Sequence, residues 1–468
     1  MYFKKDVTIQ EKFNKLKIFH NEKVAIIGSN SENYLKLLIS LLITGAVVMP
    51  LNPKYPISKI YNCLLKTDCS KLIIEENLNI NDIKDDISDI SGINLIPLGY
   101  FDDNFKEIDL MELVLQLKAK NINEIINNNA TIIFSSGSSG VPKAVLHTIG
   151  NHYFSALGSN YNIELKEGDC WFISLPLNHV SGFSTLFKSI ISGAKIKVKD
   201  KNLSLIEMIK KNNITHISLI PSQLSELIEN INNVKILKKL KAILLGGAPT
   251  PYFLVEEAKN LNLPVFVSYG STEMSSQITC TLKNDSLKHL KTSGKLLKYR
   301  ELKINEEDEI LVKGRTLFKG YIDKDKSGKE VILKPFDREG WFKTGDLGFI
   351  DEEGYLHVLG RKDFMFFYKG GKIFPEEIEN ALKEIREIND ALVISIPERE
   401  ENQVPVAFIK SKNFNSLDFE LIKKILHTKI ESYKIPQFFL NWPESYEKEL
   451  LKPDREEFKN LAIKQLKK

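Results

Sequence analysis

The stretch TIIFSSGSSGVPK, from Thr131 to Lys143, joins an apolar run to a loop of small and polar residues. The run Thr131–Phe134 has the β-branched and aromatic residues of a buried strand. The loop offers backbone N–H groups, hydroxyls and one lysine, which are suitable donors for a polyphosphate. It is not a Walker A loop, because Gly137 and Gly140 precede a lysine that is followed by Ala144. These features predict a phosphate-binding loop that follows a strand.

Two later apolar runs end in the same manner. Ala242–Leu245 runs into GGAPTP, and Val265–Ser268 runs into YGSTE. Ligands of open α/β sheets bind outside the carboxyl ends of the strands, so three such loops predict one shared site. Each loop taken alone is equally well explained as a simple turn.

Short β-branched runs alternate with amphipathic stretches near the N-terminus. This alternation is typical of βαβ units and sheets with parallel strands, and it predicts a three-layer α/β core. Residues 75–130 are rich in Asn, Asp and Ile without a clean period, and we assign no chemistry to them. The predicted strands and helices are Val24–Ile27, Asn33–Thr44, Ala46–Pro50, Ile57–Lys66 and Leu72–Ile74.

Further along the chain the pattern changes to short strands and tight turns, which predicts a small β subdomain. Pro375–Ile385 is predicted to be an amphipathic helix, followed by strands at Ala391–Ile396 and Val404–Ile409. The predicted fold class is therefore α/β. A large N-terminal domain of stacked α/β sheets with the β subdomain spans residues 1–362, and a small C-terminal α+β domain spans residues 363–468.

The composition excludes several classes of protein. Of the 468 residues, 43% are hydrophobic and 27% charged, as in a folded globular protein. The 65 basic and 61 acidic residues are intermixed and give a net charge of only +4, so nucleic acid is not an expected partner. The four cysteines show no CxxC spacing, so they do not predict a zinc site. We expect them to be buried thiols in a reducing compartment. The cysteines are Cys63, Cys69, Cys170 and Cys280.

The N-terminus lacks the apolar region of a secretory signal. The longest apolar run, Leu37–Leu51, is interrupted by polar residues, glycine and proline, so we interpret it as a buried helix followed by a strand. We therefore expect a cytoplasmic protein with no membrane span.

The segment TIIFSSGSSGVPKAV resembles the phosphate-binding signature of the adenylate-forming superfamily, which contains acyl-CoA synthetases, luciferases and peptide-synthetase adenylation domains. Further family motifs follow in the same order and cover essentially the whole chain. The resemblance implies an ATP-dependent acid–thiol ligase that uses ATP, Mg²⁺ and coenzyme A, with a mobile C-terminal domain. The matching segments are LPLNHVSG (175–182), YGSTE (269–273), GWFKTGD (340–346) and GRKDFMFFYKGGKIFPEEIE (360–379).

The same resemblance implies a role for individual residues. Tyr269 would stack on adenine, Thr272 would bond the α-phosphate and Glu273 would hold Mg²⁺ through oxygen. Asp346 would accept hydrogen bonds from the ribose hydroxyls, and Arg361 would add a donor fork beside them. The implied cofactor-binding set is Ser135, Ser136, Gly137, Ser138, Ser139, Gly140, Lys143, Gly246, Gly247, Ala248, Tyr269, Gly270, Ser271, Thr272, Asp346, Arg361, Gly370 and Gly371.

Adenylation needs positive charge where the phosphate charge concentrates, and family members carry a second lysine near the C-terminus. In ELLKPDREEF this position falls on Lys452, although Leu451 replaces the usual glycine and Pro453 follows. Lys448 is the alternative. Together with Lys452, the implied catalytic residues are His179, Thr272 and Glu273; a histidine beside apolar residues is otherwise more often a packed core residue.

Thioester formation by the CoA thiol follows a rotation of the small domain in the family, and Asp363 matches the hinge position. Gly370 and Gly371 would let the backbone approach the pantetheine channel. Phe367 stands where many family members have lysine, so the resemblance does not carry a lysine contact to that point.

Three segments resemble the ligases that act on o-succinylbenzoate in menaquinone or phylloquinone biosynthesis: LPLNHVSGFSTLFKSI, LLGGAPTP and STEMSSQIT. That resemblance places Ser276 and Gln277, with Gly246 and Gly247, near the aromatic acid. In the wider superfamily the position of His179 lines the path between the acid and the adenylate. The alternatives are another acyl- or aryl-CoA synthetase, an enzyme that loads a carrier protein, and a silent nucleotide-binding protein. The expected partners are a small-molecule carboxylic acid, ATP and CoA, with a homo-oligomer left open.

Overall fold

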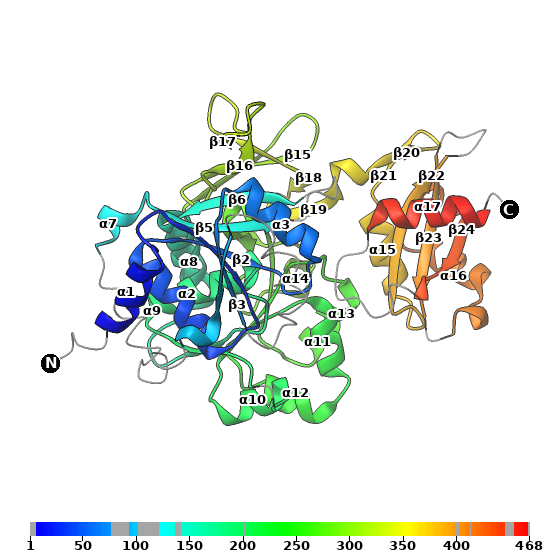
Figure 1. Ribbon diagram of the computed structural model, residues 1–468. Coiled ribbons are helices and arrows are strands. Elements are labelled where there is room, and N and C mark those ends of the chain that lie inside the picture. The colour runs from blue at the N-terminus through cyan, green and yellow to red at the C-terminus, as the bar shows by residue number, and fades with distance from the viewer. Residues whose placement is uncertain are drawn as a thin grey trace. The chain divides into compact units, whose positions relative to one another are not determined.

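The computed structural model describes residues 6–75, 93–101, 121–135, 142–200, 202–397, 403–411, 413–444 and 454–466 (Figure 1). The chain divides into two compact units. The first comprises Met1–Ala248, Leu261–Leu302 and Val312–Phe342, and the second comprises Pro249–Asn260, Lys303–Leu311 and Lys343–Lys468. The expected interval without assigned chemistry, 75–130, lies largely outside the described residues, as do Lys448 and Lys452.

The first unit contains an eight-stranded sheet with the order β17-β16-β6-β5-β2-β1-β3-β4. The β5–β2, β2–β1, β1–β3 and β3–β4 pairs are parallel. The β5–β6, β6–β16 and β16–β17 pairs are antiparallel. The strands are β1 (Lys23–Ile27), β2 (Val47–Leu51), β3 (Lys71–Ile74), β4 (Asn94–Pro97), β5 (Asn129–Ser135), β6 (Lys143–Thr148), β16 (Gly320–Lys324) and β17 (Glu330–Leu333).

A second sheet of the first unit has seven strands in the order β13-β12-β11-β10-β9-β7-β8. Its strands from β8 to β11 are parallel, and the β11–β12 and β12–β13 pairs are antiparallel. The strands are β7 (Cys170–Phe172), β8 (Lys195–Lys197), β9 (His216–Leu219), β10 (Ala242–Leu245), β11 (Val265–Ser271), β12 (Ser276–Cys280) and β13 (Lys295–Leu296).

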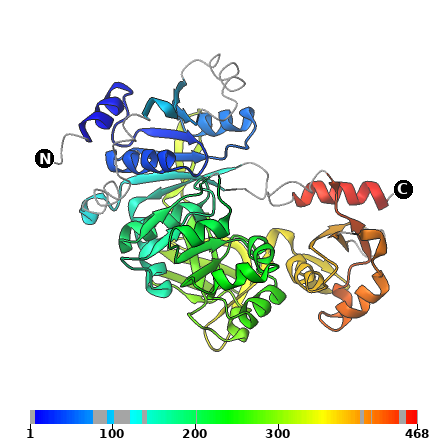
Figure 2. The same cartoon turned by 90° about the horizontal axis from the view of Figure 1, so that it is seen from below.

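Alternate residues of the first sheet face two different cores, as the period of two in a strand requires. Val24 and Ile26 join a core that continues through helices to Ile196 of the second sheet, whereas Ala25 and Ile27 pack against α3 on the opposite face. Figure 2 shows the blue strands and the green elements as separate layers of this unit. Stacked sheets with helices between them therefore form the core. The packing helices are α2 (Glu32–Thr44), α3 (Ile57–Lys66), α8 (Ile149–Ile163) and α9 (Val180–Ser192).

Shorter elements complete the first unit. They are α1 (Asp6–Lys15), η1 (Leu98–Phe101), α7 (Ile122–Ile125), α10 (Leu205–Lys211), α11 (Pro221–Ile228), α12 (Ile231–Leu237), η2 (Thr272–Met274) and α14 (Leu287–Leu290). A four-stranded sheet, with the order β14-β15-β18-β19, draws its strands from both units, and its β18–β19 hairpin lies almost entirely in the second unit. The strands are β14 (Arg300–Ile304), β15 (Glu309–Gly314), β18 (Phe342–Ile350) and β19 (Leu356–Arg361). The expected short strands and tight turns of this region are thus present.

The second unit is organised around a three-stranded sheet, β22-β23-β24, whose buried residues share one core with three helices. The rings of Phe408 on β23 and Phe458 on α17 pack edge to face, with their centres 4.9 Å apart. Its elements are α13 (Tyr252–Asn260), η3 (Lys362–Phe364), β20 (Phe366–Tyr368), β21 (Gly371–Ile373), α15 (Pro375–Lys383), β22 (Asp390–Ile396), β23 (Val404–Lys410), η4 (Phe414–Ser416), α16 (Phe419–His427), η5 (Ser432–Lys434), β24 (Phe438–Asn441) and α17 (Arg455–Leu466).

The predicted fold class is confirmed, and the predicted elements near the N-terminus agree with the structure within a residue or two. Both large sheets contain parallel strands, as predicted, and hairpins extend them in the antiparallel direction. One expectation was wrong in detail. The predicted loop at 269–273 begins later, since β11 continues to Ser271 through its pairing with β12. All four cysteines are free and buried, as expected.

Candidate active site

The phosphate loop connects the two strands of an antiparallel hairpin. Ser135 ends β5 and faces Lys143, the first residue of β6, in register. The expected loop residues Ser136, Gly137, Ser138, Ser139 and Gly140 lie outside the described part of the chain. The hairpin brings the first hydroxyl and the lysine of the motif to the same edge of the sheet.

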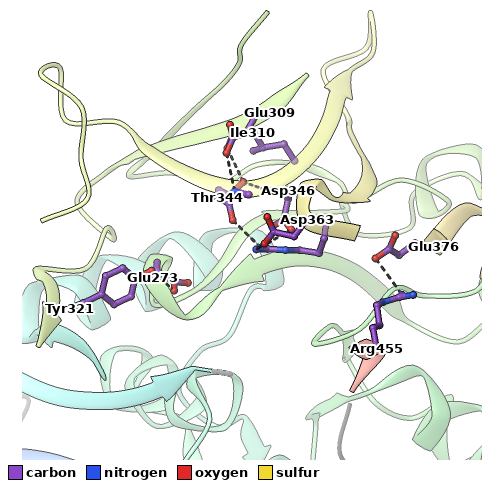
Figure 3. A network of polar contacts seen from close by, with 11 residues as sticks. Glu273, Glu309, Ile310, Tyr321, Thr344, Asp346, Asp363, Glu376 and Arg455 are labelled. Carbon is purple, nitrogen blue, oxygen red and sulfur yellow. Dashed lines mark hydrogen bonds and ion pairs between the residues drawn. The ribbon is translucent and has the colours of Figure 1, made fainter. Parts of the chain in front are cut away.

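The Thr272–Glu273 turn lies beside this hairpin. The Tyr321 hydroxyl, on β16, donates a hydrogen bond of 2.9 Å to Glu273 Oε1, and Figure 3 shows the phenol pointing at this carboxylate. The Lys143 ammonium lies 5.3 Å from the centre of the same ring. Tyr321 thus links the expected metal ligand to the lysine of the phosphate loop. Sequence reasoning missed it, because a single tyrosine in FKGYIDK carries no pattern that separates it from a core residue.

The β11–β12 hairpin explains why glycine is needed inside YGSTE. A Cβ atom on Gly270 would lie 2.0 Å from the Ser276 carbonyl oxygen, closer than the backbone allows. Ser275 and Ser276 then turn the chain with φ of 54° and 118°, in the left-handed region. Tyr269, Gly270 and Ser271 are therefore held by strand pairing, and Thr272 and Glu273 form the half-buried end of the hairpin in a short 3₁₀ turn.

The GGA segment follows β10, the parallel neighbour of β11. The Ser268 hydroxyl donates to the Leu245 carbonyl at 3.0 Å, and a Cβ on Gly246 would lie 2.9 Å from that hydroxyl. Gly247 has a φ of 80°. The ends of β10 and β11 therefore lie together, as the motif order predicted for Gly246, Gly247 and Ala248.

Gln277 does not line an open surface, because its side chain is buried within the first unit. Its Oε1 accepts hydrogen bonds from Lys188 Nζ at 2.7 Å and from Ser159 Oγ at 2.8 Å. The Lys188 side chain is 1% exposed and lies 4.9 Å from the centre of the Trp171 ring. Burial, together with the nearby Arg300 guanidinium, lowers the pKa of Lys188 to about 7. A buried lysine was not singled out in the sequence, where lysine usually indicates a surface.

His179 occupies the N-cap position of α9 with an exposed side chain. The alternative of a packed core histidine is therefore wrong for this residue. Its backbone carbonyl accepts from Phe183 N at 2.9 Å, which begins the helix. Lys188 lies further along the same helix, so α9 carries both side chains.

In the second unit Asp346 and Arg361 face each other in register across the β18–β19 hairpin. Arg361 donates to Asp346 Oδ1 at 3.2 Å and to the Thr344 carbonyl at 2.9 Å, and it lies 3.4 Å from Asp363 Oδ2. The Thr344 hydroxyl in turn donates to the Ile310 carbonyl at 2.7 Å, as Figure 3 shows. Burial lowers the pKa of Arg361, but the two carboxylates outweigh it and raise the pKa overall. The expected ribose residues and the expected hinge residue thus form one charged cluster.

The β20–β21 hairpin borders a pocket of about 490 Å³. Phe367 and Gly370 line it, and Phe367 is 59% exposed. Gly370 has a φ of 77°, which favours glycine, and a Cβ on Gly371 would press against the Tyr433 ring. The two expected glycines are therefore placed at a hollowed surface of the second unit.

Arg455 anchors the start of α17 in the second unit. Its guanidinium lies 2.7 Å from Glu379 Oε1 and 3.5 Å from Glu376 Oε1, and Figure 3 shows it beside Glu376. Burial and the Glu379 carboxylate raise the pKa of Glu376 to about 7. Arg455 therefore holds the chain three residues after the expected catalytic position.

Within the described ranges, no group of three or more His, Cys, Asp or Glu side chains has the arrangement of a metal site. A magnesium ion that arrives with a nucleotide needs fewer protein ligands, because it keeps waters and binds phosphate oxygens. Glu273, with one oxygen fixed by Tyr321, suits that role. No helix among the described residues is long and apolar enough to cross a membrane.

Comparison with known proteins gives a consistent result. Residues 13–322 match the AMP-binding enzymes, and residues 377–446 match the C-terminal domain of AMP-binding enzymes. The chain is 35% identical to 2-succinylbenzoate–CoA ligase of Oceanobacillus iheyensis over 87% of this chain and 82% of that protein.

Two solved structures of o-succinylbenzoate CoA synthetase (MenE) from Bacillus subtilis are similar to it. The complex with the acyl-adenylate intermediate OSB-AMP has a TM-score of 0.81 and 28% identity, covering 98% of this chain and 92% of that one. The complex with ATP and magnesium ion has a TM-score of 0.77 and 29% identity, covering 92% and 88%. The match over most of its length shows that this chain belongs to the family of AMP-binding enzymes.

Proposed function

We propose that the protein is an ATP-dependent acid–CoA ligase that acts on o-succinylbenzoate. A carboxylate oxygen of the acid attacks the α-phosphorus of ATP, and pyrophosphate leaves. The CoA thiol then attacks the acyl carbon, its proton passes to solvent, and AMP leaves with the electron pair of the broken bond. The ligases named for relatives of this chain support the substrate.

The observation that carries this proposal is the pairing of Glu273 and Lys143 at Tyr321. A carboxylate and an ammonium beside one ring provide a ligand for a hard cation and a charge for phosphate oxygens. Mg²⁺, when bound with ATP, neutralises phosphate charge that would otherwise repel the attacking carboxylate. The Thr272 hydroxyl, at the same turn, is the donor to the α-phosphate.

The nucleotide base and sugar would be held by the remaining predicted residues. Tyr269 and the Gly246–Ala248 segment are assigned to adenine, because they end neighbouring parallel strands. Asp346 and Arg361 are assigned to the ribose, and Asp363 to the hinge that reorients the second domain, residues 363–468. The pocket beside Gly370 and Gly371 is assigned to the pantetheine of CoA.

Lys188 supports a dicarboxylic substrate. It is fully buried, its hydrogen bond goes to a neutral amide, and the described residues give it no carboxylate partner. Burial disfavours its charged form and lowers its pKa to about 7, and a ligand carboxylate beside it would favour the ammonium form. o-Succinylbenzoate has two carboxylates: one reacts, and we assign the other to Lys188 with Gln277 and Ser276 beside it. His179, at the start of the same helix, is assigned to the acid's entrance.

Free, buried thiols and the need for ATP and CoA fit residence in the cytoplasm. The expected partners remain ATP, CoA and the acid, and a homo-oligomer stays open.

The test is ATP–pyrophosphate exchange with o-succinylbenzoate beside acetate, medium-chain fatty acids, benzoates and amino acids. We expect exchange with o-succinylbenzoate alone, and a thioester when CoA is added. Exchange with a different acid would contradict the substrate. Transfer to a phosphopantetheine carrier protein but not to CoA would identify a carrier-loading enzyme, and ATP binding without any exchange would identify a silent nucleotide-binding protein.

The catalytic lysine is tested separately, because both candidates lie outside the described residues. Lys452→Ala is expected to reduce adenylation by roughly 100-fold or more while sparing thioester formation from preformed acyl-adenylate. Lys448→Ala tests the alternative and should change neither step; loss of adenylation in this variant but not in Lys452→Ala would place the catalytic lysine at Lys448. Equal loss of both half-reactions in Lys452→Ala would show that the lysine is placed wrongly.

A further inference from the structure

Three buried polar side chains form a line beneath the Thr272–Glu273 turn, and neither the motifs nor the proposed chemistry uses them. Thr131 lies on β5, His147 on β6 and His152 on α8, and their exposures are 0%, 0% and 1%. Thr131 Oγ1 lies 2.8 Å from His152 Nε2 and 3.3 Å from His147 Nδ1. His147 Nε2 lies 2.7 Å from the Thr272 carbonyl oxygen.

The Thr272 carbonyl at the end of this line determines the direction of each of its three hydrogen bonds. A carbonyl only accepts, so His147 carries its proton on Nε2. In a neutral ring Nδ1 then accepts, and the Thr131 hydroxyl donates to it. The Thr131 oxygen therefore accepts from His152 Nε2–H. The hydrogen bonds all point the same way, from His152 towards Thr272.

The two imidazoles are uncharged near neutral pH. Burial lowers the pKa of His147 to about 4, although its bond to the Thr272 carbonyl opposes the shift. Burial and the neighbouring His147 also lower the pKa of His152 well below its ordinary value. The His152 ring lies 4.9 Å from Phe183 and 5.0 Å from Phe187, and its Nδ1 has no hydrogen-bond partner among the described residues. Burying His152 Nδ1 without a hydrogen-bond partner costs stability that a purely apolar core would not lose.

The backbone that receives this line is under strain. The Thr272 carbonyl also accepts from Ser275 N at 3.0 Å, and Ser275 and Ser276 both have positive φ angles. The Ser155 hydroxyl of α8 donates to the Ser275 carbonyl at 2.7 Å. Strained backbone of this kind persists only where the surroundings hold it. His147 bonds the Thr272 carbonyl and Ser155 bonds the Ser275 carbonyl, so both hold the backbone of the turn. Tyr321 holds the Glu273 carboxylate.

We propose that His147, aligned by Thr131 and His152, is a positioning residue that fixes the Thr272 carbonyl and so aims the Thr272 hydroxyl and the Glu273 carboxylate at the nucleotide. The inference rests on the proposed adenylation function of this turn. It assigns the three buried side chains a role in the reaction, because rotation of the Thr272–Glu273 peptide would move both groups together.

The test compares His147→Gln with His147→Leu in ATP–pyrophosphate exchange. Gln can donate from its amide to the Thr272 carbonyl and accept from Thr131, whereas Leu fills space without a donor. We expect His147→Leu to lower kcat roughly 30-fold with little change in the KM for the acid, since misplaced catalytic groups cost up to about 100-fold. His147→Gln should stay within about fivefold of wild type, because it keeps the bond to the carbonyl. Equal loss in both variants, or no loss in either, would overturn the proposal.

A second pair covers the case in which His147→Leu does not fold. Thr131→Val breaks the line, and Thr67→Val is its control, because both threonines are fully buried in the first unit and Thr67 bonds the Cys63 carbonyl instead. Thr131→Val should lower kcat, and Thr67→Val should not. Equal kcat in the two variants would overturn the proposal.

Nitrogen-15 NMR of histidine-labelled wild-type protein gives a readout that does not depend on the reaction. His147 and His152 should both be Nε2–H tautomers at pH 7, assigned by loss of the signals in His147→Gln and His152→Phe. An Nδ1–H tautomer at His147 would overturn the inference whatever the activity. Correct tautomers with no exchange in wild type would instead contradict the proposed function.

Discussion

Two polar networks of this molecule are built in opposite ways. In the first unit, Thr131, His147 and His152 are completely buried, and the two imidazoles are uncharged near neutral pH. In the second unit, the side chains of Asp346, Arg361 and Asp363 are 15%, 36% and 52% exposed and are linked by charge. The first is held by directed neutral hydrogen bonds, and the second by ion pairs at 3.2 and 3.4 Å.

The difference teaches what each network is suited to do. A neutral, dry line of hydrogen bonds holds one geometry and is little affected by salt. A half-exposed charged cluster is weak in each contact, so a ligand hydroxyl or phosphate can replace one of its partners. The buried network is therefore suited to hold the Thr272–Glu273 turn rigidly. The charged cluster is suited to exchange its contacts with a ligand.

The largest expected effect is the loss of stability of the buried network at acidic pH. The folded-state pKa of His147, about 4, lies below its ordinary value of 6.5, so the unfolded chain binds more protons between these pH values. The free energy of unfolding should therefore rise with pH from about 4 to 6.5 and then level off, by about 3 kcal/mol for this residue. Urea unfolding across this range measures it. His147→Gln should show a shallower slope, and the exposed control His20→Gln should keep the wild-type slope.

Asp346→Asn is expected to raise the KM for ATP roughly 30-fold, because a charged acceptor for the ribose hydroxyls is lost. Asp351→Asn is the control in the same hairpin, where the carboxylate bonds His357 and the turn backbone instead. Initial rates of pyrophosphate exchange at varied ATP measure both. An unchanged KM in Asp346→Asn would remove this residue from the ribose site.

Lys188 shares a feature with each network, since it is fully buried and can still carry a charge, although burial lowers its pKa to about 7. Lys188→Met should raise the KM for o-succinylbenzoate by roughly tenfold and leave the KM for ATP unchanged, because a charge-assisted contact is lost. Thermal unfolding of the same variant should show no loss of stability, since an uncompensated buried charge is removed. A rise in the KM for ATP instead would place Lys188 on the nucleotide side.

The smallest effect is expected at the rim of the charged cluster. Lys362 lies 2.6 Å from the exposed Glu307 carboxylate. It also lies 3.4 Å from Glu309, a buried carboxylate that accepts a second hydrogen bond from Gly345 N. Because the shorter pair is exposed and Glu309 keeps its backbone donor, Lys362→Met should lower Tm by less than about 2 °C. The difference should vanish in about 1 M salt. A larger or salt-independent loss would show that the charged cluster is more rigid than its exposure indicates.

Much of the fold follows from local pattern. The β-branched runs and the amphipathic stretches predicted β1, α2, β2 and α3, because strand and helix periods are visible in a single segment. The antiparallel edges were not predicted, because pairing partners such as β6 and β16 are far apart in sequence. The same reason explains the end of β11, since Ser271 is kept in a strand by Ser276.

The site was predictable where a motif carries it and not elsewhere. Asp346 and Arg361 each belonged to a motif, but only the register of β18 and β19 shows that they face each other. Tyr321 belonged to no motif, and Lys188 lay in the segment LPLNHVSGFSTLFKSI but was not singled out there; their roles depend on partners at Glu273 and Gln277. HTIGNH, from His147 to His152, gave no signal because two histidines five residues apart usually indicate nothing.

The sequence by itself determined the elements, the order of the motifs and the class of chemistry, because each depends on residues that are neighbours in the chain. Only the tertiary structure decided which side chains are buried together and which way their hydrogen bonds point. The protonation of His147 depends on the Thr272 carbonyl, which belongs to a strand end more than a hundred residues away. Burial and hydrogen-bond direction are properties of packed neighbours, so no local pattern records them.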